Sequence, residues 1–275
     1  MAKAKTDPMD AAEVPAVPSV KICGIRDETT LAGLLTLPVD QIGFVFAPSR
    51  RRVTPEQAGA WIKRVKAERG PARHRTVGVF VEPGRDELAA VLDRAPVDIV
   101  QLHSREPAEY CRWIKERFGV EVWRVVSFSA APDDSAGASR PASIRSADTS
   151  NGLPNGRNAN DTYPTDLYAA AAGPGEALKP FAGIADAILL DTYDPVTVGG
   201  SGRTFPWTAI PGYRAAAHRL GLKLIAAGGL TAANVRTLLD EYAPDGVDVS
   251  GGVETDGSKD WTKIKAFVER VKGHE

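Results

Sequence analysis

Two side chains that could take part in chemistry stand at the ends of short apolar runs. Cys23 ends the run VKIC, and Asp191 ends the run AILLD. A carboxylate is costly to bury without a partner or a function, so Asp191 is a candidate site residue, with a helix N-cap or a structural ion pair as the alternative. A thiol at such a junction would face a ligand, although free cysteines are also often buried as small apolar residues. Cys111, within a predicted helix, fits that second description.

Three glycine-rich turns follow apolar runs in the last third of the chain. Their backbone N–H groups could wrap a phosphate or another oxyanion, and a helix N-terminus beside them would add partial positive charge. Each turn alone could be an ordinary loop, but three at one edge indicate an anion site. The turn residues are Gly200 and Gly202, Gly228 and Gly229, and Ser250, Gly251 and Gly252.

Further polar residues stand where other apolar runs end. The loop APSRRR places Arg51 between two more arginines, and Gln101, His103 and Asp248 lie at the ends of two runs. We predict that these last three support a pocket, with a structural histidine as the favoured interpretation of His103. A solvated basic loop is the alternative for the arginines beside Arg51.

The elements that must position these residues are short apolar runs that alternate with amphipathic, helix-like segments. The runs are mostly continuous, which is typical of strands buried on both faces. Thr54 as an N-cap, Pro55 in the first turn and Gly70 as a stop predict one of the helices. The predicted strands are VKIC, QIGFVF, TVGVFV, VDIVQL, VEVWRVVSF, DAILLD, LKLIAA and GVDVS.

This alternation predicts an α/β fold, a single (β/α)8 TIM barrel, with functional groups where the strands end. A doubly wound open sheet is the alternative, but ICGIRD lacks the glycine fingerprint that such a fold needs after its first strand. Residues 1–17 are predicted to be a flexible tail and residues 18–275 the barrel domain. Within it, residues 130–165 are rich in Ser, Ala, Asn, Asp, Gly and Pro, which predicts a disordered insertion after the fifth strand.

The composition argues against several classes of partner. The 275 residues carry a formal net charge of -1, so no overall field attracts nucleic acid or an anionic membrane. No run approaches the roughly 20 apolar residues of a membrane span. Two cysteines are too few for a disulfide framework and are not spaced as zinc ligands, so we expect a cytoplasmic protein without a metal. The sequence leaves the oligomeric state open, either monomer or homodimer.

Together these stretches resemble the phosphoribosylanthranilate isomerase family of tryptophan biosynthesis. The resemblance implies a TIM barrel enzyme that needs no cofactor. Its small phosphorylated substrate would be N-(5-phosphoribosyl)anthranilate, and its product 1-(2-carboxyphenylamino)-1-deoxyribulose 5-phosphate. The matching motifs occur in the family's order from Val20 onward, and they are KICGI, GFVFAPSRRRVTPEQA, VGVFV, VQLH, LLDT, GGSGRTFPW, AGGLTAANV and DVSGGVE.

The same resemblance implies roles for the matched residues. Cys23 would be the general base and Asp191 the general acid of an Amadori rearrangement. Arg51 would pair with the anthranilate carboxylate, which a guanidinium can bind through two hydrogen bonds. Gly251 departs from the family pattern, because a second serine usually stands there. Its backbone N–H remains, but a hydroxyl contact to phosphate is lost.

Other functions remain open at this stage. Another phosphosugar barrel, such as indole-glycerol-phosphate synthase, would share the phosphate-binding loops, but that enzyme resembles a lysine-dependent catalyst. Here the only lysine near the end of an early strand is Lys21, which precedes the thiol. A barrel that only binds a phosphorylated ligand would require neither Cys23 nor Asp191. A second substrate, the related aminoaldose of histidine biosynthesis, is disfavoured because enzymes that use it carry paired aspartates.

Overall fold

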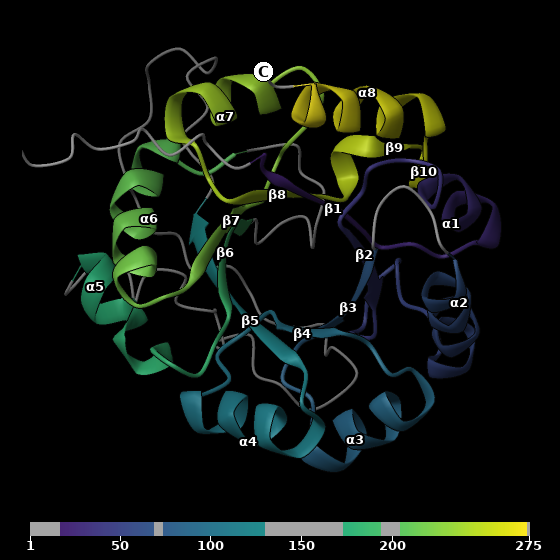
Figure 1. The fold of residues 1–275 in the computed structure, drawn as a ribbon, viewed down its shortest axis with the longest axis horizontal. Coiled ribbons are helices and arrows are strands. Elements are labelled where there is room, and N and C mark those ends of the chain that lie inside the picture. Colours follow the sequence, from purple (N-terminus) through teal and green to yellow (C-terminus); the bar gives the residue numbers. More distant parts are fainter. Residues whose placement is uncertain (1–16, 69–73, 130–172, 194–203, 274–275) are drawn as a thin grey trace, which may run out of the picture.

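The computed structural model describes residues 17–68, 74–129, 173–193 and 204–273, and Figure 1 draws the others as a thin grey trace. The predicted insertion at residues 130–165 lies outside the described residues. So do Gly200, Gly202 and all of the predicted N-terminal tail except Val17.

Eight parallel strands form a closed barrel, which confirms the predicted TIM barrel (Figure 1). Each strand pairs with the next one along the chain, and the last pairs with the first. All eight predicted runs form strands. They are β1 (Ser19–Cys23), β2 (Gln41–Val45), β3 (Arg75–Phe80), β4 (Ile99–Leu102), β5 (Glu121–Ser129), β6 (Ala187–Tyr193), β7 (Lys223–Ala226) and β8 (Gly246–Val249).

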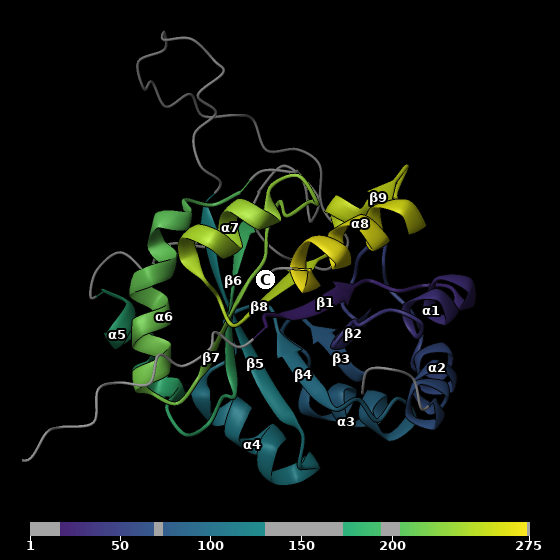
Figure 2. The same ribbon diagram turned by 45° about the horizontal axis from the view of Figure 1, so that its top comes forward.

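Helices surround the barrel on its outside, as the two ribbon views show (Figures 1 and 2). They are α1 (Glu28–Leu34), α2 (Pro55–Ala67), α3 (Arg85–Arg94), α4 (Ala108–Phe118), α5 (Gly173–Leu178), α6 (Ile210–Arg219), α7 (Val235–Tyr242) and α8 (Trp261–Lys272). The described residues also form three short 3₁₀ helices, η1 (Lys179–Phe181), η2 (Trp207–Ala209) and η3 (Gly251–Val253). A small hairpin of β9 (Glu254–Thr255) and β10 (Ser258–Lys259) follows η3, and the sequence did not predict it.

Local sequence explains where α2 begins. The Thr54 side chain accepts a hydrogen bond from the Gln57 backbone N–H, and the Gln57 side chain accepts one in return from the Thr54 N–H. This capping box satisfies two amide groups that the first helical turn leaves without partners. The predicted start is therefore confirmed, but the helix ends at Ala67, before the predicted stop at Gly70, which lies outside the described residues.

Side chains that alternate along each strand point either outward to the helices or inward to the barrel interior, which gives two separate cores. In β1, Val20 and Ile22 belong to the large cluster between strands and helices, whereas Cys23 belongs to a small cluster inside the barrel. A second interior cluster is formed by Val77, Ile99, Trp123, Val125, Ala187, Leu189, Ile225 and Ala227. Because successive side chains of a strand point to opposite faces, Lys21 shares the interior face with Cys23.

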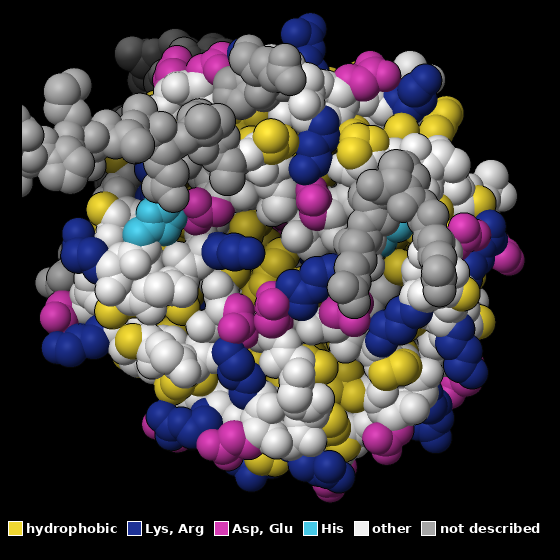
Figure 3. Space-filling model, viewed as in Figure 1, with side chains coloured by type: hydrophobic (Ala, Val, Ile, Leu, Met, Phe, Trp, Pro, Cys, Tyr) yellow, Lys and Arg dark blue, Asp and Glu magenta, His cyan; other side chains and the backbone are white. Residues whose placement is uncertain are grey.

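The same aspartate hydrogen bond occurs four times at the face of the barrel where the strands begin. A carboxylate just before each even-numbered strand accepts a backbone N–H from the preceding odd-numbered strand. The four aspartates are Asp40, Asp98, Asp186 and Asp245, and the four donors are Val20, Thr76, Val122 and Leu224. Figure 3 shows this face, where Lys and Arg side chains lie among Asp and Glu around an apolar centre. We therefore assign it a structural role.

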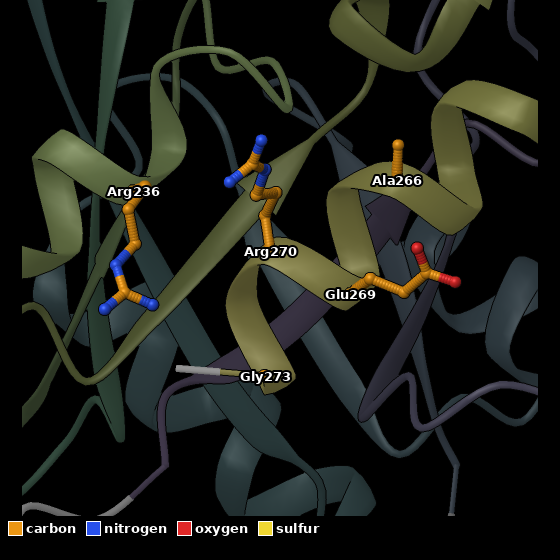
Figure 4. A pocket seen from close by; sticks show the side chains of 5 residues that line it. All are labelled: Arg236, Ala266, Glu269, Arg270 and Gly273. Atoms are coloured by element: carbon orange, nitrogen blue, oxygen red, sulfur yellow. The ribbon is translucent and has the colours of Figure 1, made fainter. Parts of the chain in front are cut away.

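A surface pocket of about 420 Å³ lies between α7 and α8 (Figure 4). It is lined by Arg236, Ala266, Glu269, Arg270 and Gly273, all from helices or their ends. Arg236 already pairs with Asp240 of its own helix at 3.0 Å. No strand residue lines this pocket, so it is separate from the strand ends. Within the described ranges, no helix is both long and apolar enough to cross a membrane.

Candidate active site

The strand ends bring most of the predicted site residues to one mouth of the barrel. Cys23 ends β1, and its carbonyl accepts a hydrogen bond from Ser250 Oγ at 3.1 Å, which links β1 to the turn after β8. Across the mouth, His103 Nε2 lies 3.2 Å from Asp191 Oδ2. Asp248 lies close enough to Asp191 and His103 for their charges to affect its ionisation. These contacts place groups from β1, β4, β6 and β8 around a common interior.

Cys23 is nearly buried at this mouth, with 7% of its surface exposed. Gly43 of the neighbouring strand makes room for it, because a Cβ there would lie 2.9 Å from the cysteine sulfur. Burial raises the pKa of the Cys23 thiol, while the nearby charges of Lys21 and Lys259 act in the opposite direction. The thiol is therefore shielded from solvent but not from positive charge.

A short polar chain holds Asp191. Gln101 Nε2 lies 3.3 Å from His103 Nδ1, and His103 Nε2 lies 3.2 Å from Asp191. A side-chain amide that donates to Nδ1 leaves the ring proton on Nε2, which then donates to the carboxylate. The second carboxylate oxygen, Oδ1, accepts the Thr192 backbone N–H at 2.7 Å. His103 thus has a partner at each ring nitrogen, and one of these partners is the candidate catalytic carboxyl.

Arg51 is buried and bound to a residue that the sequence analysis missed. Its Nε and Nη2 donate to the two carboxylate oxygens of Glu254 at 2.7 and 2.8 Å. Arg50 and Lys259 also contact this carboxylate, at 2.8 and 3.0 Å. Arg50 is therefore not a purely solvated charge, whereas Arg52 is exposed. Three cations share one anion here, so the cluster keeps an excess of positive charge that suits an anionic ligand.

The residue directly after the thiol, Gly24, must be a glycine for two reasons. Its φ of +79° lies in the left-handed region, and a Cβ at this position would come within 2.6 Å of Arg51 Cδ. Any other residue would push the arginine away from the strand ends. The glycine next to Cys23 thus allows the chain after β1 to turn and the guanidinium stem to pass.

The described glycine turns pack closely against one another. Gly228 has a φ of +77°, and a Cβ there would lie 2.6 Å from the Thr192 backbone nitrogen at the end of β6. A Cβ on Gly252 would collide with the Leu230 carbonyl, so the turns after β7 and β8 are in contact. Gly229 also has a positive φ, of +63°. Two of the three predicted turns therefore meet at one edge of the mouth.

Sequence reasoning also underestimated Lys21. Its Nζ donates to Asp248 Oδ2 at 2.7 Å, and its side chain is fully buried. The available signal was its position two residues before Cys23, which places both on one face of a strand. Glu254 and Lys259 offered no comparable signal, because the arginine that Glu254 binds is 203 positions away in the sequence. Within the part of the chain that the structure describes, no three His, Cys, Asp or Glu side chains are grouped as metal ligands.

The Glu254 cluster predicts a specific acid sensitivity of the fold. Burial opposes ionisation, but hydrogen bonds from Arg51 and Lys259 hold the pKa of Glu254 at about 2, below its ordinary 4.5. A carboxyl with a lowered folded-state pKa stabilises the fold above pH 4.5 and loses that contribution as the pH falls towards 2. Glu254→Gln should therefore lower Tm at pH 7, and the Tm of this variant should fall less steeply than that of the parent as the pH drops from 4.5 towards 2. Thermal unfolding against pH tests this, with exposed Glu68→Gln as the control. An equally steep fall of Tm with acid in parent and variant would contradict it.

A closed (β/α)8 barrel with a thiol, a carboxyl and glycine turns at its strand ends defines the class as a barrel enzyme. Comparison with known proteins gives the family. The family model described as "N-(5'phosphoribosyl)anthranilate (PRA) isomerase" matches residues 20–143 and 175–270. The chain belongs to the phosphoribosylanthranilate isomerase family, enzymes of tryptophan biosynthesis.

Individual relatives agree with the family assignment. The chain is 38% identical over 256 residues to N-(5'-phosphoribosyl)anthranilate isomerase of Brevibacillus brevis, with 93% of this chain and 94% of the relative covered. It resembles the crystal structure of the Thermotoga maritima enzyme with a TM-score of 0.66 and 32% identity, covering 93% of this chain and 99% of that one. A further crystal structure, with a TM-score of 0.61, 30% identity and the same coverage, is a complex with reduced 1-(o-carboxyphenylamino)-1-deoxyribulose 5-phosphate.

Proposed function

We propose that this enzyme converts N-(5-phosphoribosyl)anthranilate to 1-(2-carboxyphenylamino)-1-deoxyribulose 5-phosphate, with Cys23 as general base and Asp191 as general acid. The observation that supports these roles best is that Cys23 ends β1, Asp191 lies near the end of β6, and both lie among polar groups at the same mouth of the barrel. A related structure holds a reduced form of that product, which supports the class of ligand.

Asp191 suits the first proton transfer. Protonation of the furanose ring oxygen opens the ring and leaves an iminium ion. An acid for this step must hold its carboxyl in a fixed direction, and hydrogen bonds with His103 and the Thr192 backbone fix that direction. Gln101 in turn contacts His103, so it helps to hold the imidazole ring that orients Asp191.

Cys23 suits the second proton transfer. The iminium ion acidifies the adjacent C2–H bond, so a thiolate is a sufficient base. Removal of that proton forms an enolamine, which tautomerises to the ketone and completes the Amadori rearrangement. Nearly complete burial of the thiol keeps water away from the reacting carbon.

The remaining groups would bind the two ends of the substrate. We assign the phosphate to the turns at Gly228, Gly229 and residues 250–252, because these turns meet at one edge of the mouth and the backbone N–H groups of glycine-rich turns can bind an oxyanion. We assign the anthranilate carboxylate to Arg51, which reaches the mouth beside Gly24. Glu254 would then hold the guanidinium in place rather than compete for it, because Arg50 and Lys259 also neutralise that carboxylate.

Of the rival functions, a lysine-dependent barrel fits the geometry poorly. Lys21 is fully buried beneath the strand end and paired with Asp248, so its amine does not face the open mouth. A barrel that only binds a phosphorylated ligand would not explain why a carboxyl is held by His103 opposite a shielded thiol. We also propose a cytoplasmic location, because both cysteines are free thiols.

A turnover assay tests the proposed reaction. Phosphoribosylanthranilate is generated in situ, and its loss and the appearance of the ketone product are followed with and without the protein. Catalytic turnover supports the isomerase. Stoichiometric binding without turnover would favour a ligand-binding barrel, and release of an indole product would favour the synthase.

Substitution of the three neighbouring arginines tests the substrate contact. Arg51→Ala should raise KM far more than Arg50→Ala or Arg52→Ala, because only a guanidinium aimed at the ligand carboxylate loses a desolvated charge pair. Steady-state kinetics on the three variants measures this. Since Arg51 also holds Glu254, the Tm of each variant is recorded beside Glu254→Gln. If Arg51→Ala lowered Tm as Glu254→Gln does but left KM unchanged, its role would be structural only.

A further inference from the structure

Lys21 carries a positive charge inside the barrel, where charge is costly to bury. Its side chain is fully buried and shares the interior face of β1 with Cys23, two residues further on. An unpaired ammonium in such a place is strongly destabilising, so it needs good partners. Its surroundings therefore indicate what the charge does.

The ammonium has a carboxylate partner and lies close to the thiol. Lys21 and Asp248 are directly paired residues of β1 and β8, and Nζ donates to Oδ2 at 2.7 Å. The Lys21 side chain and the Cys23 sulfur also lie close together on the interior face of β1, near enough for the lysine charge to act on the thiol. Gly43 leaves space for both side chains, since a Cβ there would lie 2.9 Å from the sulfur and 3.2 Å from Lys21 Cε. Lys21 thus carries its charge beside both a carboxylate and the thiol.

Lys21 and Asp248 have opposite electrostatic effects on the thiol. Burial raises the pKa of Cys23, Lys21 lowers it and Asp248 raises it further. The other charges that face the sulfur are Lys259, from β10, and Arg51, from the loop after β2. Although burial disfavours the ammonium, Asp248 and Cys23 together raise the pKa of Lys21, so it stays charged.

We propose that Lys21 is a positioning residue that stabilises the thiolate form of Cys23 through its neighbouring positive charge, while Asp248 anchors Lys21 and opposes ionisation of the thiol. The proposal rests on Cys23 being the base proposed above. It makes the base a three-residue unit in which the proton taken from C2 is stored on sulfur and the lysine keeps its own protons. The alternative is that Lys21 and Asp248 only join β1 to β8.

The pH dependence of Cys23 alkylation separates these two roles without relying on catalysis. Cys111 is replaced by alanine in all proteins, so that Cys23 is the single thiol. The rate of iodoacetamide addition, followed by intact mass against pH, gives the midpoint of Cys23 ionisation. Each rate profile is divided by its own plateau value at high pH, so that differences in how easily the reagent reaches Cys23 cancel.

Lys21→Met should move this midpoint to higher pH, with scaled alkylation at neutral pH at least about tenfold slower, since one pKa unit corresponds to tenfold. Asp248→Asn should move the midpoint to lower pH. A merely structural pair predicts no shift, or shifts of the same direction that follow the loss of Tm. Either result would overturn the proposal.

Two further variants keep the test decisive. If Lys21→Met does not fold, the double variant Lys21→Met with Asp248→Asn removes the uncompensated charge, and its midpoint should lie above that of Asp248→Asn alone. Equal midpoints would overturn the proposal. Lys272→Met breaks another 2.7 Å lysine–aspartate pair, with Asp40 at the far end of the barrel, and should leave the profile unchanged. Turnover by Cys23→Ala tests the proposed function separately, because alkylation reports on Lys21 whichever residue is the base.

Discussion

Cys23→Ala should lower kcat by about 10² or more while leaving the fold intact, because removal of a general base forfeits that much of the rate. The change removes one buried sulfur atom from a small interior cluster, so its effect on Tm should be small by comparison. Steady-state kinetics and thermal unfolding of the same preparation measure both. Near-parental turnover would rule out Cys23 as the base.

A matched substitution makes the result specific. Cys111→Ala removes the other buried thiol, which lies within α4 and does not face the barrel interior, so it should retain parental kcat. Cys23→Ser should also turn over poorly, because a hydroxyl is a much weaker acid than a thiol and does not supply the anion. Activity of the serine variant close to that of the parent would argue for a positioning role of residue 23 instead.

Asp191→Asn should produce a comparable loss, again about 10² or more in kcat, because the amide cannot deliver a proton to the ring oxygen. The amide remains close in size and can still contact His103, which makes asparagine a sharper test than alanine. Asp191→Ala should lose at least as much. The measurement is kcat and KM of both variants across pH.

The control for Asp191 is an acidic residue outside the mouth. Asp240→Asn changes a side chain of α7 that pairs with Arg236, and it should leave kcat unchanged. If Asp191→Asn raised KM but spared kcat, the carboxylate would bind substrate instead of protonating it. Another group would then have to be sought as the acid.

Local patterns made the barrel predictable. Continuous apolar runs are typical of parallel strands covered on both faces, and all eight became strands. Thr54 and Pro55 marked the start of α2 because capping depends on neighbouring residues. The β9–β10 hairpin was missed because its two-residue strands are too short to show a pattern. The end of α2 was also misplaced, since the chain leaves the helix before its glycine.

The site was predictable only in part. Strand ends and family motifs pointed to Cys23, His103 and Asp191, and the structure places them at the same mouth. It also shows that His103 holds Asp191, which a pattern of residue types does not reveal. For Arg51, the sequence suggested a ligand contact but gave no sign of the carboxylate that it binds within the protein.

By itself, the sequence determined the family, the alternation of strands and helices, and which residues stand at strand ends, because all of these depend on neighbours along the chain. Only the tertiary structure decided which distant residues meet. Lys21 pairs with Asp248 and Arg51 with Glu254 across 227 and 203 positions. Those pairs exist because β8 closes against β1 in one register and brings the last loop beside the first strands. A charged side chain can be buried in this arrangement only where a partner lies within hydrogen-bonding distance. No local sequence pattern specifies that partner.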